Sequence, residues 1–453
     1  MSNVTKDGAH LMDTKRKVLL VAYWFPPLGG IGTRRAMRYV RYLPDFGWQC
    51  YVVTVADAIN DIHRLMMDES LTATVPAQTK IVRTPAWYIG RLPQVFDHRG
   101  LGMIWRWVRR AARTPVPDEC IGWLPFAYHA AKQMVCNEGI QVVYTVSEPF
   151  TAHMVGLLLK RRLGVSWVAD FRDEWSQHPL RGFEHDWQRG LSRWLEQRVL
   201  LNADQVITVT ESYHDSMASL VPKEMWTKFV TITNGYQAED FSVPPIQGRP
   251  DKLRIVYVGL FYLAQQPIDF LSAVEQVVRE RIIPRDHLQI ILVGPDKSAS
   301  VTADVSRFET TLGDIIEWTG YVSHREAVGY LKGADVLLLI ASRPRGSRNI
   351  PGKTFEYIAA GTPILVLATA ESAAAELVRQ TGTGVAFAAP DDIHGIAKAL
   401  AELYERWQNG TLAVKPDWSL ISEYEGRRLT EKLSAVLQPL ARGEGGRKGH
   451  YGG

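Results

Sequence analysis

The feature that most constrains this chain is a rhythm of short apolar runs and longer helical segments, which occurs twice along the sequence. In the first half the apolar runs are 18–23, 49–55, 141–146, 167–171, 205–210 and 230–233. In the second half they are 253–258, 288–293, 315–318, 336–340, 364–368 and 385–388. Continuous apolar strands separated by helices are typical of parallel sheets with both faces covered. The sequence therefore predicts an α/β protein with two doubly wound, Rossmann-like domains.

The best boundary between the two series is 243–251, which holds three prolines and a glycine. A chain of 453 residues is also long enough for two or three domains. We expect domains over 1–245 and 250–415, a last helix within 416–440 that returns to the first domain, and a disordered tail over 441–453. Two doubly wound domains leave a deep cleft between them, and ligands bind at the carboxyl ends of the strands.

Composition excludes several classes of protein. A net charge of only +4 gives no sign of nucleic-acid binding. The three cysteines, Cys50, Cys120 and Cys136, are scattered and form no CxxC pair, so neither a disulfide framework nor a zinc site is expected. No run of 18 apolar residues is present, and the apolar run after Lys17 is broken at Pro26 without a cleavage site. These features favour a cytoplasmic protein.

The strongest motif is a basic, glycine- and proline-containing loop at 343–352, which follows an apolar strand and opens a helix. Its three arginines and Lys353 supply positive charge, and the helix start supplies free N–H groups, so a phosphate or diphosphate is the expected guest. Lys353 and Glu356 are three residues apart and share a helix face. The lysine can neutralise phosphate while the carboxylate accepts two ribose hydroxyls; helix capping with a surface ion pair is the alternative. Neither position resembles a core position.

Two weaker motifs stand at the ends of other predicted strands. Gly29 and Gly30 lie in a glycine loop before a helix, which is compatible with a ligand-facing loop or with a tight turn. The spacing is not that of a dinucleotide fingerprint. Asp170 and Asp173 lie at the end of the run 167–171, where charged residues usually face the cleft. The alternative is a carboxylate paired with Arg172 at the sheet edge.

Taken in order, these motifs resemble the GT-B glycosyltransferases, specifically the retaining, family 4-like group. The resemblance covers nearly the whole chain. It is carried by 25–30 (FPPLGG), 170–175 (DFRDEW), 232–235 (ITNG), 256–259 (VYVG), 320–322 (GYV), 334–335 (AD) and 352–363 (GKTFEYIAAGTP). Each motif is loose, but their order and spacing over two domains are specific.

The resemblance implies a nucleotide-sugar donor held by the second domain and an acceptor against the first. It matches Glu356 to the carboxylate that binds the donor ribose, Gly30 to the loop near the diphosphate and sugar, and Tyr321 to the region of the base. The candidate donor-binding residues are Gly29, Gly30, Tyr321, Arg348, Gly352, Lys353, Thr354 and Glu356. The candidate catalytic residues are Lys353, Asp170 and Asp173. No metal or other cofactor is expected, since Lys353 and the arginines neutralise the leaving diphosphate.

Three departures from the family pattern keep other functions open. The residue eight positions before Glu356 is Arg348 instead of a carboxylate, Ser147 stands where a histidine is usual, and 260–266 (LFYLAQQ) lacks the usual cations. A catalytically inactive GT-B subunit and a sugar-nucleotide epimerase of the same fold therefore remain alternatives. A glycoside hydrolase is not favoured, because it would leave the phosphate loop unexplained and nothing requires its two flanking carboxylates.

The segment 98–117 contains no acidic residue and places apolar and arginine side chains on different sides of a predicted helix. Such a helix can lie in an anionic membrane interface, or it can pack its apolar side on its own domain. We therefore expect peripheral attachment to the cytoplasmic face of a membrane. We also expect a lipid-linked acceptor and a role in surface polysaccharide or glycoconjugate synthesis. The sequence identifies neither the sugar, nor the base, nor the acceptor.

Overall fold

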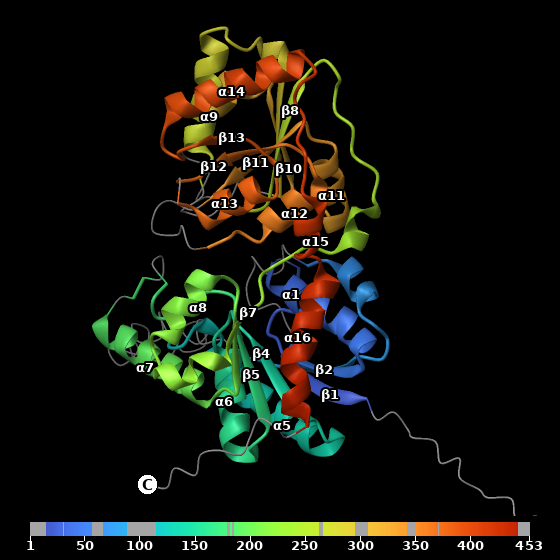
Figure 1. Ribbon diagram of the computed structural model, residues 1–453, viewed down its shortest axis with the longest axis vertical. Helices are drawn as coiled ribbons and strands as arrows, with labels where there is room; N and C mark the ends of the chain where they lie inside the picture. The colour runs from blue at the N-terminus through green and yellow to red at the C-terminus, as the bar shows by residue number, and fades with distance from the viewer. Residues whose placement is uncertain are drawn as a thin grey trace, which may run out of the picture.

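The protein consists of two α/β domains, one above the other in Figure 1. The computed structural model describes residues 15–29, 31–56, 67–87, 115–178, 182–183, 185–261, 266–294, 307–341, 349–369 and 371–442. The first domain contains a seven-stranded sheet in the order β3-β2-β1-β4-β5-β6-β7, and the second a six-stranded sheet in the order β10-β9-β8-β11-β12-β13. All neighbouring strands in both sheets pair in parallel. The predicted fold class is confirmed.

The first domain alternates strands with helices along the chain. Its strands are β1 (Arg16–Val21), β2 (Trp48–Val55), β3 (Lys80–Thr84), β4 (Val142–Val146), β5 (Ser166–Phe171), β6 (Gln205–Thr208) and β7 (Phe229–Thr231). Its helices are α1 (Ile31–Tyr42), α5 (Leu124–Glu138), α6 (Thr151–Leu163), α7 (Asp186–Asn202) and α8 (Glu211–Ala218). Helices α5 to α8 pack on one face of the sheet, and α1 packs on the other.

The second domain repeats this plan. Its strands are β8 (Leu253–Val258), β9 (Leu288–Val293), β10 (Ile316–Gly320), β11 (Val336–Ile340), β12 (Ile364–Leu367) and β13 (Gly384–Ala388). Its helices are α9 (Ile268–Arg279), α11 (His324–Lys332), α12 (Lys353–Ala360), α13 (Ala373–Gln380), α14 (Ile393–Gln408) and the short α15 (Trp418–Ser422). Helices α9 and α14 cover one face, and α11, α12 and α13 cover the other. The central strand β11, Val-Leu-Leu-Leu-Ile, is buried along its whole length, which is why it carries no polar alternation.

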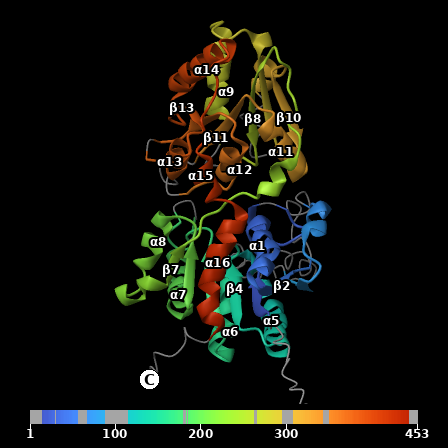
Figure 2. The ribbon, with the colours of Figure 1, turned by 45° about the vertical axis from the view of Figure 1, so that its right-hand side comes forward.

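The last helix, α16 (Gly426–Ala441), lies in the first domain beside α1 (Figure 2). Leu429, Leu433, Leu437 and Leu440 recur at helical spacing and join the same core as β1 and β4. Trp48 Nε1 donates to Ser434 Oγ at 3.0 Å, which ties the helix to β2. The chain thus crosses between the domains twice.

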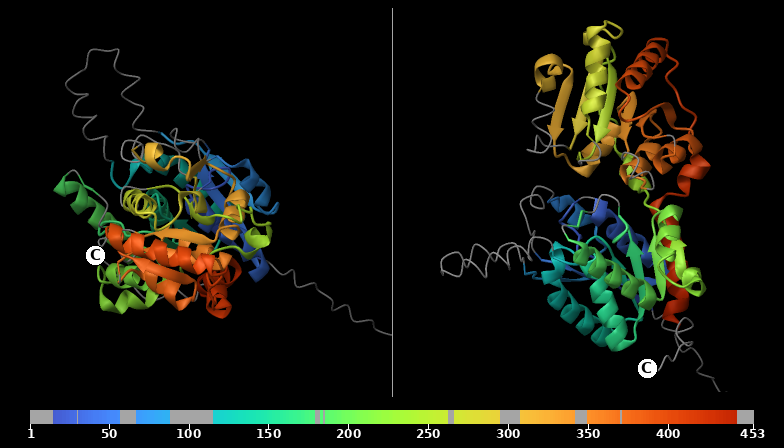
Figure 3. Two further views of the ribbon diagram at one scale, coloured as in Figure 1. Left: turned by 90° about the horizontal axis from the view of Figure 1, so that it is seen from above. Right: turned by 90° about the vertical axis from the view of Figure 1, so that its left-hand side faces the viewer.

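The two crossings run side by side. The backbone N–H of Tyr236 donates to the carbonyl of Tyr424 at 3.1 Å, and the N–H of Gly426 donates to the carbonyl of Tyr236 at 2.8 Å. Figure 3 shows both crossings, one yellow-green and one red, on the same side of the molecule. This arrangement leaves the rest of the space between the domains available for a site.

The strand and helix runs predicted from the sequence correspond closely to observed elements, and β8, β9 and β11 have the predicted bounds. Among the described strands and α-helices, β3, α8 and the short α15 were not predicted. The strand β3 reads Lys-Ile-Val-Arg-Thr at the edge of its sheet, and only Thr84 of its five residues is buried. It therefore lacks the apolar run by which the interior strands were recognised. Residues 98–114 and 443–453, predicted as an amphipathic helix and a tail, lie outside the described residues.

Candidate active site

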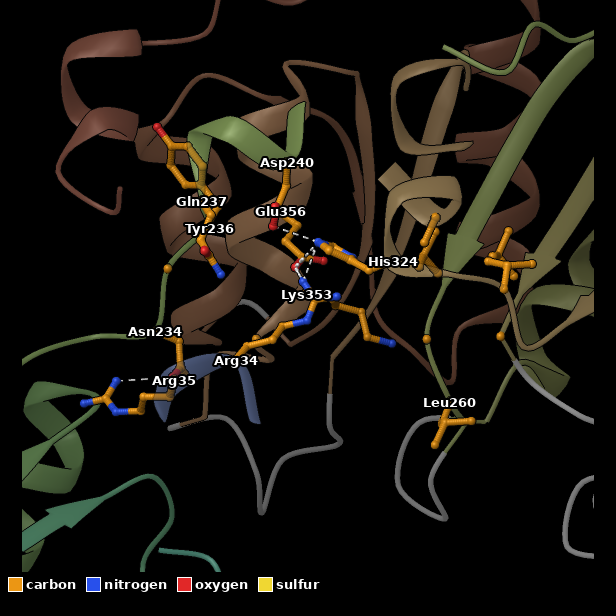
Figure 4. A pocket seen from close by; sticks show the side chains of 18 of the residues that line it. Arg34, Arg35, Asn234, Tyr236, Gln237, Asp240, Leu260, His324, Lys353 and Glu356 are labelled. Atoms are coloured by element: carbon orange, nitrogen blue, oxygen red, sulfur yellow. Dashed lines mark hydrogen bonds and ion pairs between the residues drawn. The ribbon is translucent and has the colours of Figure 1, made fainter. Parts of the chain in front are cut away.

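A pocket lies between the domains, with about 1340 Å³ of space not filled by protein atoms when open solvent is included. Its walls come from α1, from the first crossing, from the ends of β8 and β9, and from the starts of α11 and α12 (Figure 4). The side chains and backbone that line it belong to Arg34, Arg35, Arg38, Asn234, Gly235, Tyr236, Gln237, Asp240, Val258, Gly259, Leu260, Val293, Gly294, Tyr321, Val322, His324, Ala327, Gly352, Lys353 and Glu356.

The start of α12 points into this pocket. Gly352 caps the helix without a side chain, and Lys353 and Glu356 stand one turn apart on the pocket side. The helix ends at Gly361, whose φ of 68° suits glycine. The positive end of the helix dipole therefore faces the pocket, while the N–H groups of Thr354 and Phe355 donate to the carbonyls of Pro351 and Gly352.

Lys353 is held in a mostly buried position, with a relative exposure of 8%. Its Nζ donates to the Tyr257 hydroxyl at 2.6 Å and lies 4.0 Å from the centre of the Tyr257 ring. Burial lowers the pKa of Lys353 to about 7, and the nearby Glu356 carboxylate offsets only part of that effect. The expectation that position 353 is not a core position is wrong, because Tyr257 and the end of β8 enclose the lysine.

The end of β8 leaves room for Lys353 and for a ligand. Gly259 has a φ of 126°, and a Cβ there would lie 2.8 Å from Lys353 Nζ. Gly294 at the end of β9 has a φ of 97°. Both positions favour glycine for backbone reasons. The two strand ends therefore expose backbone to the pocket, as a binding site for a bulky ligand requires.

Glu356 is paired across the cleft with Arg34 of α1. Arg34 Nη1 donates to Glu356 Oε1 and also lies 2.8 Å from His324 Nε2. His324 Nε2 in turn lies 2.9 Å from Asp240 Oδ2. Because one ring nitrogen either donates or accepts, Nε2 hydrogen-bonds only one of these two partners at a time. Figure 4 shows Arg34, Glu356 and His324 converging from the two domains.

The charges of this cluster stabilise the ionised form of Asp240. Burial by itself would raise the pKa of Asp240, but its hydrogen bond and attraction to His324, with the charge of Arg34, lower the pKa below its usual value. The cluster therefore joins two carboxylates, an arginine and a histidine around the pocket, and its one fixed cation is supplied by the opposite domain.

Asp170 does not face the cleft, which corrects the prediction from the sequence. Its carboxylate is fully buried. It accepts hydrogen bonds from Arg35 Nε at 2.6 Å and from Arg35 Nη2 at 2.9 Å, and a third from the Tyr144 hydroxyl. Arg35 directly follows Arg34 in α1, and its side chain reaches Asp170 beneath the pocket. The partner is thus Arg35 and not the neighbouring Arg172. Asp173 is partly buried and does not line the pocket.

The other sequence-predicted residues fall into three groups. Gly352, Lys353, Glu356 and the half-exposed Tyr321 line the pocket together. Gly29 and Thr354 are buried and do not line it; Gly29 accepts a hydrogen bond from Thr33 Oγ1 at 3.3 Å. Gly30 and Arg348 lie outside the described residues, as do the arginines of the basic loop.

Arg34, Asp240, Tyr257 and His324 are among the residues of the site that were not predicted from the sequence. Arg34 stands in the first turn of a helix that follows a glycine loop, which is a signal that could have been used. His324 is at the start of the helix after β10 and would have been found by the same reasoning. No local signal marks Asp240 or Tyr257, because they enter the site only through the packing of distant segments.

The departures from the family pattern also have places in the structure. Ser147 is buried, and its Oγ accepts a hydrogen bond from the N–H of Arg172 at 3.3 Å. It therefore ties the ends of β4 and β5 together and does not reach the pocket.

Within the described residues, no group of three or more His, Cys, Asp or Glu side chains is placed to hold a metal ion. Over the same part of the chain, no helix is long and apolar enough to cross a bilayer.

Two family models match the sequence. Residues 29–235 match a glycosyl transferase 4-like domain, and residues 252–406 match the group 1 glycosyl transferases. The two matches together span most of the chain, and residues 236–251, which include the first crossing between the domains, lie between them. A search of curated protein sequences finds no match.

Solved structures of the same fold match nearly the whole chain. Sucrose-phosphate synthase from Thermosynechococcus elongatus is 17% identical with a TM-score of 0.61, over 95% of this chain and 97% of that one. Anabaena Alr3699/HepE in complex with UDP and glucose is 13% identical with a TM-score of 0.63, over 93% and 99%. A UDP-N-acetylglucosamine 2-epimerase assigned in Listeria monocytogenes is 12% identical with a TM-score of 0.54, over 94% and 96%. At these identities the likeness concerns the fold.

Proposed function

Because the chain belongs to the GT-B glycosyltransferases of the 4-like and group 1 kinds, we propose that it transfers a sugar from a nucleotide-sugar donor bound in the interdomain pocket. The observation that carries this proposal is the start of α12, which presents Gly352, Lys353 and Glu356 to the pocket beside the open backbone of Gly259. A helix start with a lysine can bind a diphosphate, and a carboxylate one turn further along can accept hydrogen bonds from the attached ribose.

The donor in this proposal lies with its diphosphate at the start of α12 and its ribose hydroxyls on Glu356. Its base extends toward Tyr321 and Val322 after β10. Complexes of HepE with UDP and with UDP-glucose support a nucleotide sugar as the class of donor. The first domain supplies the acceptor side of the cleft.

Transfer is proposed to occur with retention at the sugar carbon. The bond from this carbon to the diphosphate oxygen breaks, and the acceptor oxygen forms its bond on the same face. The departing phosphate oxygen takes the acceptor proton, so no side-chain base is needed. Lys353 and the N–H groups of α12 stabilise the charge that grows on the leaving diphosphate. Closure of the domains around the pocket excludes water and limits hydrolysis of the donor.

Neither Asp170 nor a bound metal has a step in this proposal. Asp170 is committed to Arg35. Stabilisation of the charge on the leaving group is assigned to Lys353, to the start of α12 and to Arg34, which also lines the pocket. We propose a surface polysaccharide or glycoconjugate pathway as the setting, with a lipid-linked acceptor as the first to test.

A thermal-shift and turnover screen tests the proposal. The purified chain is mixed with UDP, ADP, GDP and their sugar conjugates, with and without lipid-linked acceptors, in the presence and absence of EDTA. A nucleotide at about 100 times its Kd should stabilise the fold by about 2.7 kcal/mol and raise its melting temperature. NMR of the product gives the anomeric configuration and tests retention.

Three outcomes of this screen would contradict the proposal in different ways. Epimerised sugar nucleotide without acceptor would indicate the epimerase alternative. Binding without turnover under every acceptor condition would favour an inactive subunit. No binding of any nucleoside diphosphate would remove the donor site from the pocket altogether.

A further inference from the structure

Helix α1 buries two guanidinium groups, and a carboxylate pairs with only one of them in the described structure. Arg35 and Arg38 are 2% and 3% exposed, and they lie 5.6 Å and 5.1 Å from the centre of the Tyr39 ring. Asp170 accepts hydrogen bonds from two nitrogens of Arg35. Arg38 forms no ion pair within the described part of the chain, and its Nε has no hydrogen-bond partner there. A buried charge without a partner is costly, so the position of Arg38 calls for a reason.

Both crossings between the domains approach Arg38. A Cβ at Gly235 in the first crossing would lie 2.9 Å from Arg38 Nη1. A Cβ at Gly426, where the second crossing enters α16, would lie 3.0 Å from Arg38 Cδ. The lack of a side chain at these two positions therefore provides the space that the arginine occupies.

Arg38 also lines the interdomain pocket, together with Asn234 and Gly235. We call these three residues the hinge end of the pocket, because the crossings join the domains there. Arg38 is one helical turn, about 6 Å, further along α1 than Arg34, which contacts Glu356 (Figure 4). The pocket therefore extends beyond the region assigned to the proposed donor, toward the hinge.

The charge at the hinge end is positive and costly to keep there. Burial lowers the pKa of Arg38 and the charge of Arg35 lowers it further, although Tyr39 and Asp170 act in the opposite direction. An arginine nonetheless stays protonated in a protein. On the first crossing, the Thr233 hydroxyl is another buried group without a hydrogen-bond partner in the described structure. These groups favour a bound anion over an apolar ligand or a cation.

We propose that the hinge end binds a small oxyanion of the phosphate type, in addition to the diphosphate of the donor. The guanidinium presents its N–H donors in one plane, where they match two oxygens of a phosphate. A bound phosphate supplies the negative charge that Arg38 lacks, as Asp170 does for Arg35. Water in the pocket solvates the group but does not neutralise it. Only the position of the donor in this inference rests on the proposed function.

Isothermal titration with inorganic phosphate, at constant ionic strength, tests the hinge end. The first arm uses protein saturated with UDP, so that the donor region is occupied. Wild type should bind phosphate with a Kd of about 1 mM or below. Arg38→Met keeps a long side chain and removes the guanidinium, so it should bind phosphate at least about tenfold more weakly. Its affinity for UDP should stay within about two- to threefold of wild type.

The second arm does not depend on nucleotide binding. It uses free Lys353→Met, in which the start of α12 has lost its lysine. This variant should still bind phosphate at the hinge end, whereas Lys353→Met/Arg38→Met should bind it at least about tenfold more weakly. Failure of UDP to bind wild type would count against the proposed function and leave the comparison of these two variants intact.

Thermal unfolding separates a ligand-binding role of Arg38 from a structural one. Without phosphate, Arg38→Met should melt at or above the temperature of wild type, because an apolar side chain has replaced a buried unpaired charge. With UDP present, phosphate should raise the melting temperature of wild type further but not that of the variant. Arg161→Met removes an exposed arginine of α6 in the same domain and changes the net charge equally. This control should respond to phosphate as wild type does.

Each contrary result overturns the proposal. Equal phosphate affinity of wild type and Arg38→Met would place the anion elsewhere. Strict competition between phosphate and UDP would assign the anion to the diphosphate of the donor, and no uptake of phosphate in either arm would leave no anion site at all. An Arg38→Met protein that melts well below wild type without phosphate would show that the fold itself already satisfies the arginine.

Discussion

Arg34 and Arg35 are neighbours in the first turns of α1, yet their side chains belong to two different charge clusters. Arg35 reaches down into the first domain, where Asp170 and the carbonyls of Ile232 and Thr233 accept its hydrogen bonds. Arg34 reaches up across the cleft to Glu356 and His324 of the second domain. One cluster is enclosed by a single domain, and the other exists only while two domains face each other.

The difference in burial decides what each cluster can do. The Arg35 and Asp170 side chains are at most 1% exposed. Burial alone would lower the pKa of Arg35, but Asp170 more than offsets it and the pKa is raised. Breaking this pair leaves a charge stranded in the interior. Arg34 and Glu356 are partly solvated, so water can replace either partner at small cost. The buried cluster therefore holds the fold, and the cleft cluster can exchange partners with a ligand.

The largest expected effect comes from the buried cluster. Arg35→Met should destabilise the protein by about 3–5 kcal/mol, because Asp170 and the buried carbonyls lose their donor. Urea denaturation measures the loss. Arg35→Met/Asp170→Leu should recover part of it, since no carboxylate is then buried without its arginine, while the carbonyls of Ile232 and Thr233 still lack their donor. A loss below about 1 kcal/mol for the single variant would erase the distinction between the two clusters.

Lys353→Ala should act on turnover instead of stability. Removing a contact to the leaving diphosphate typically costs about 10²–10³ in rate. Nucleotide binding should weaken less, because the charge grows in the transition state. The fold should persist, since Tyr257 still donates to the carbonyl of Leu260. Single-turnover kinetics with the best donor measure the effect; unchanged turnover would remove Lys353 from the chemistry.

The pH dependence of nucleotide binding checks the same residue. The pKa of Lys353 is lowered to about 7 in the ligand-free pocket, and a bound diphosphate favours the protonated form. Affinity for UDP should therefore fall as pH rises above about 7, by at most about tenfold per pH unit. Phosphate groups with a pKa near about 6 are already ionised there. Lys353→Met should bind more weakly and without this pH dependence; an equal slope in both proteins would place the titrating group elsewhere.

Glu356→Gln should weaken nucleotide binding by about 1–3 kcal/mol, because an amide accepts hydroxyl hydrogen bonds less strongly than a carboxylate. The loss should appear with the nucleoside diphosphate as well as with the full donor. It should shrink for a 2′,3′-dideoxy analogue, which has no ribose hydroxyls. Isothermal titration gives these affinities. Equal affinity of wild type and variant for the diphosphate would move the ribose contact to another residue.

The smallest expected effect is that of Arg34→Gln. A partly exposed ion pair contributes about 0–1 kcal/mol, so the unfolding free energy should change little. Glu356 then loses its competitor, and affinity for an uncharged nucleoside should stay equal or rise a few-fold. Affinity for the diphosphate should fall, because a cation leaves the pocket. A strong loss of stability would show that the cleft cluster is structural after all.

Helices and strands were predicted more accurately than the hydrogen-bond partners of individual side chains. The strand before α12, the loop and the start of the helix were predicted, because they depend on local signals. Lys353 and Glu356 were placed correctly on one face. Asp170 was assigned to the cleft and is buried, because its position at a strand end does not reveal that Arg35 reaches it from α1, 135 residues away. Asp240 and Tyr257 were missed for the same kind of reason, since they meet His324 and Lys353 only through the packing of segments far apart in the chain.

What the sequence determined by itself is the order of strands and helices, their two-domain grouping and the chemistry of the loop before α12. These follow from periodicity and turn residues, which act between near neighbours in the chain. Only the tertiary structure decided which arginine is buried, which one crosses the cleft, and which face of α7 turns outward. The buried side of α7 holds Val199 and Leu200 together with Gln188, Ser192 and Glu196, so apolar periodicity alone does not define it. Glu196 is buried because Ser176 donates hydrogen bonds to its carboxylate, and this contact exists only in the folded domain.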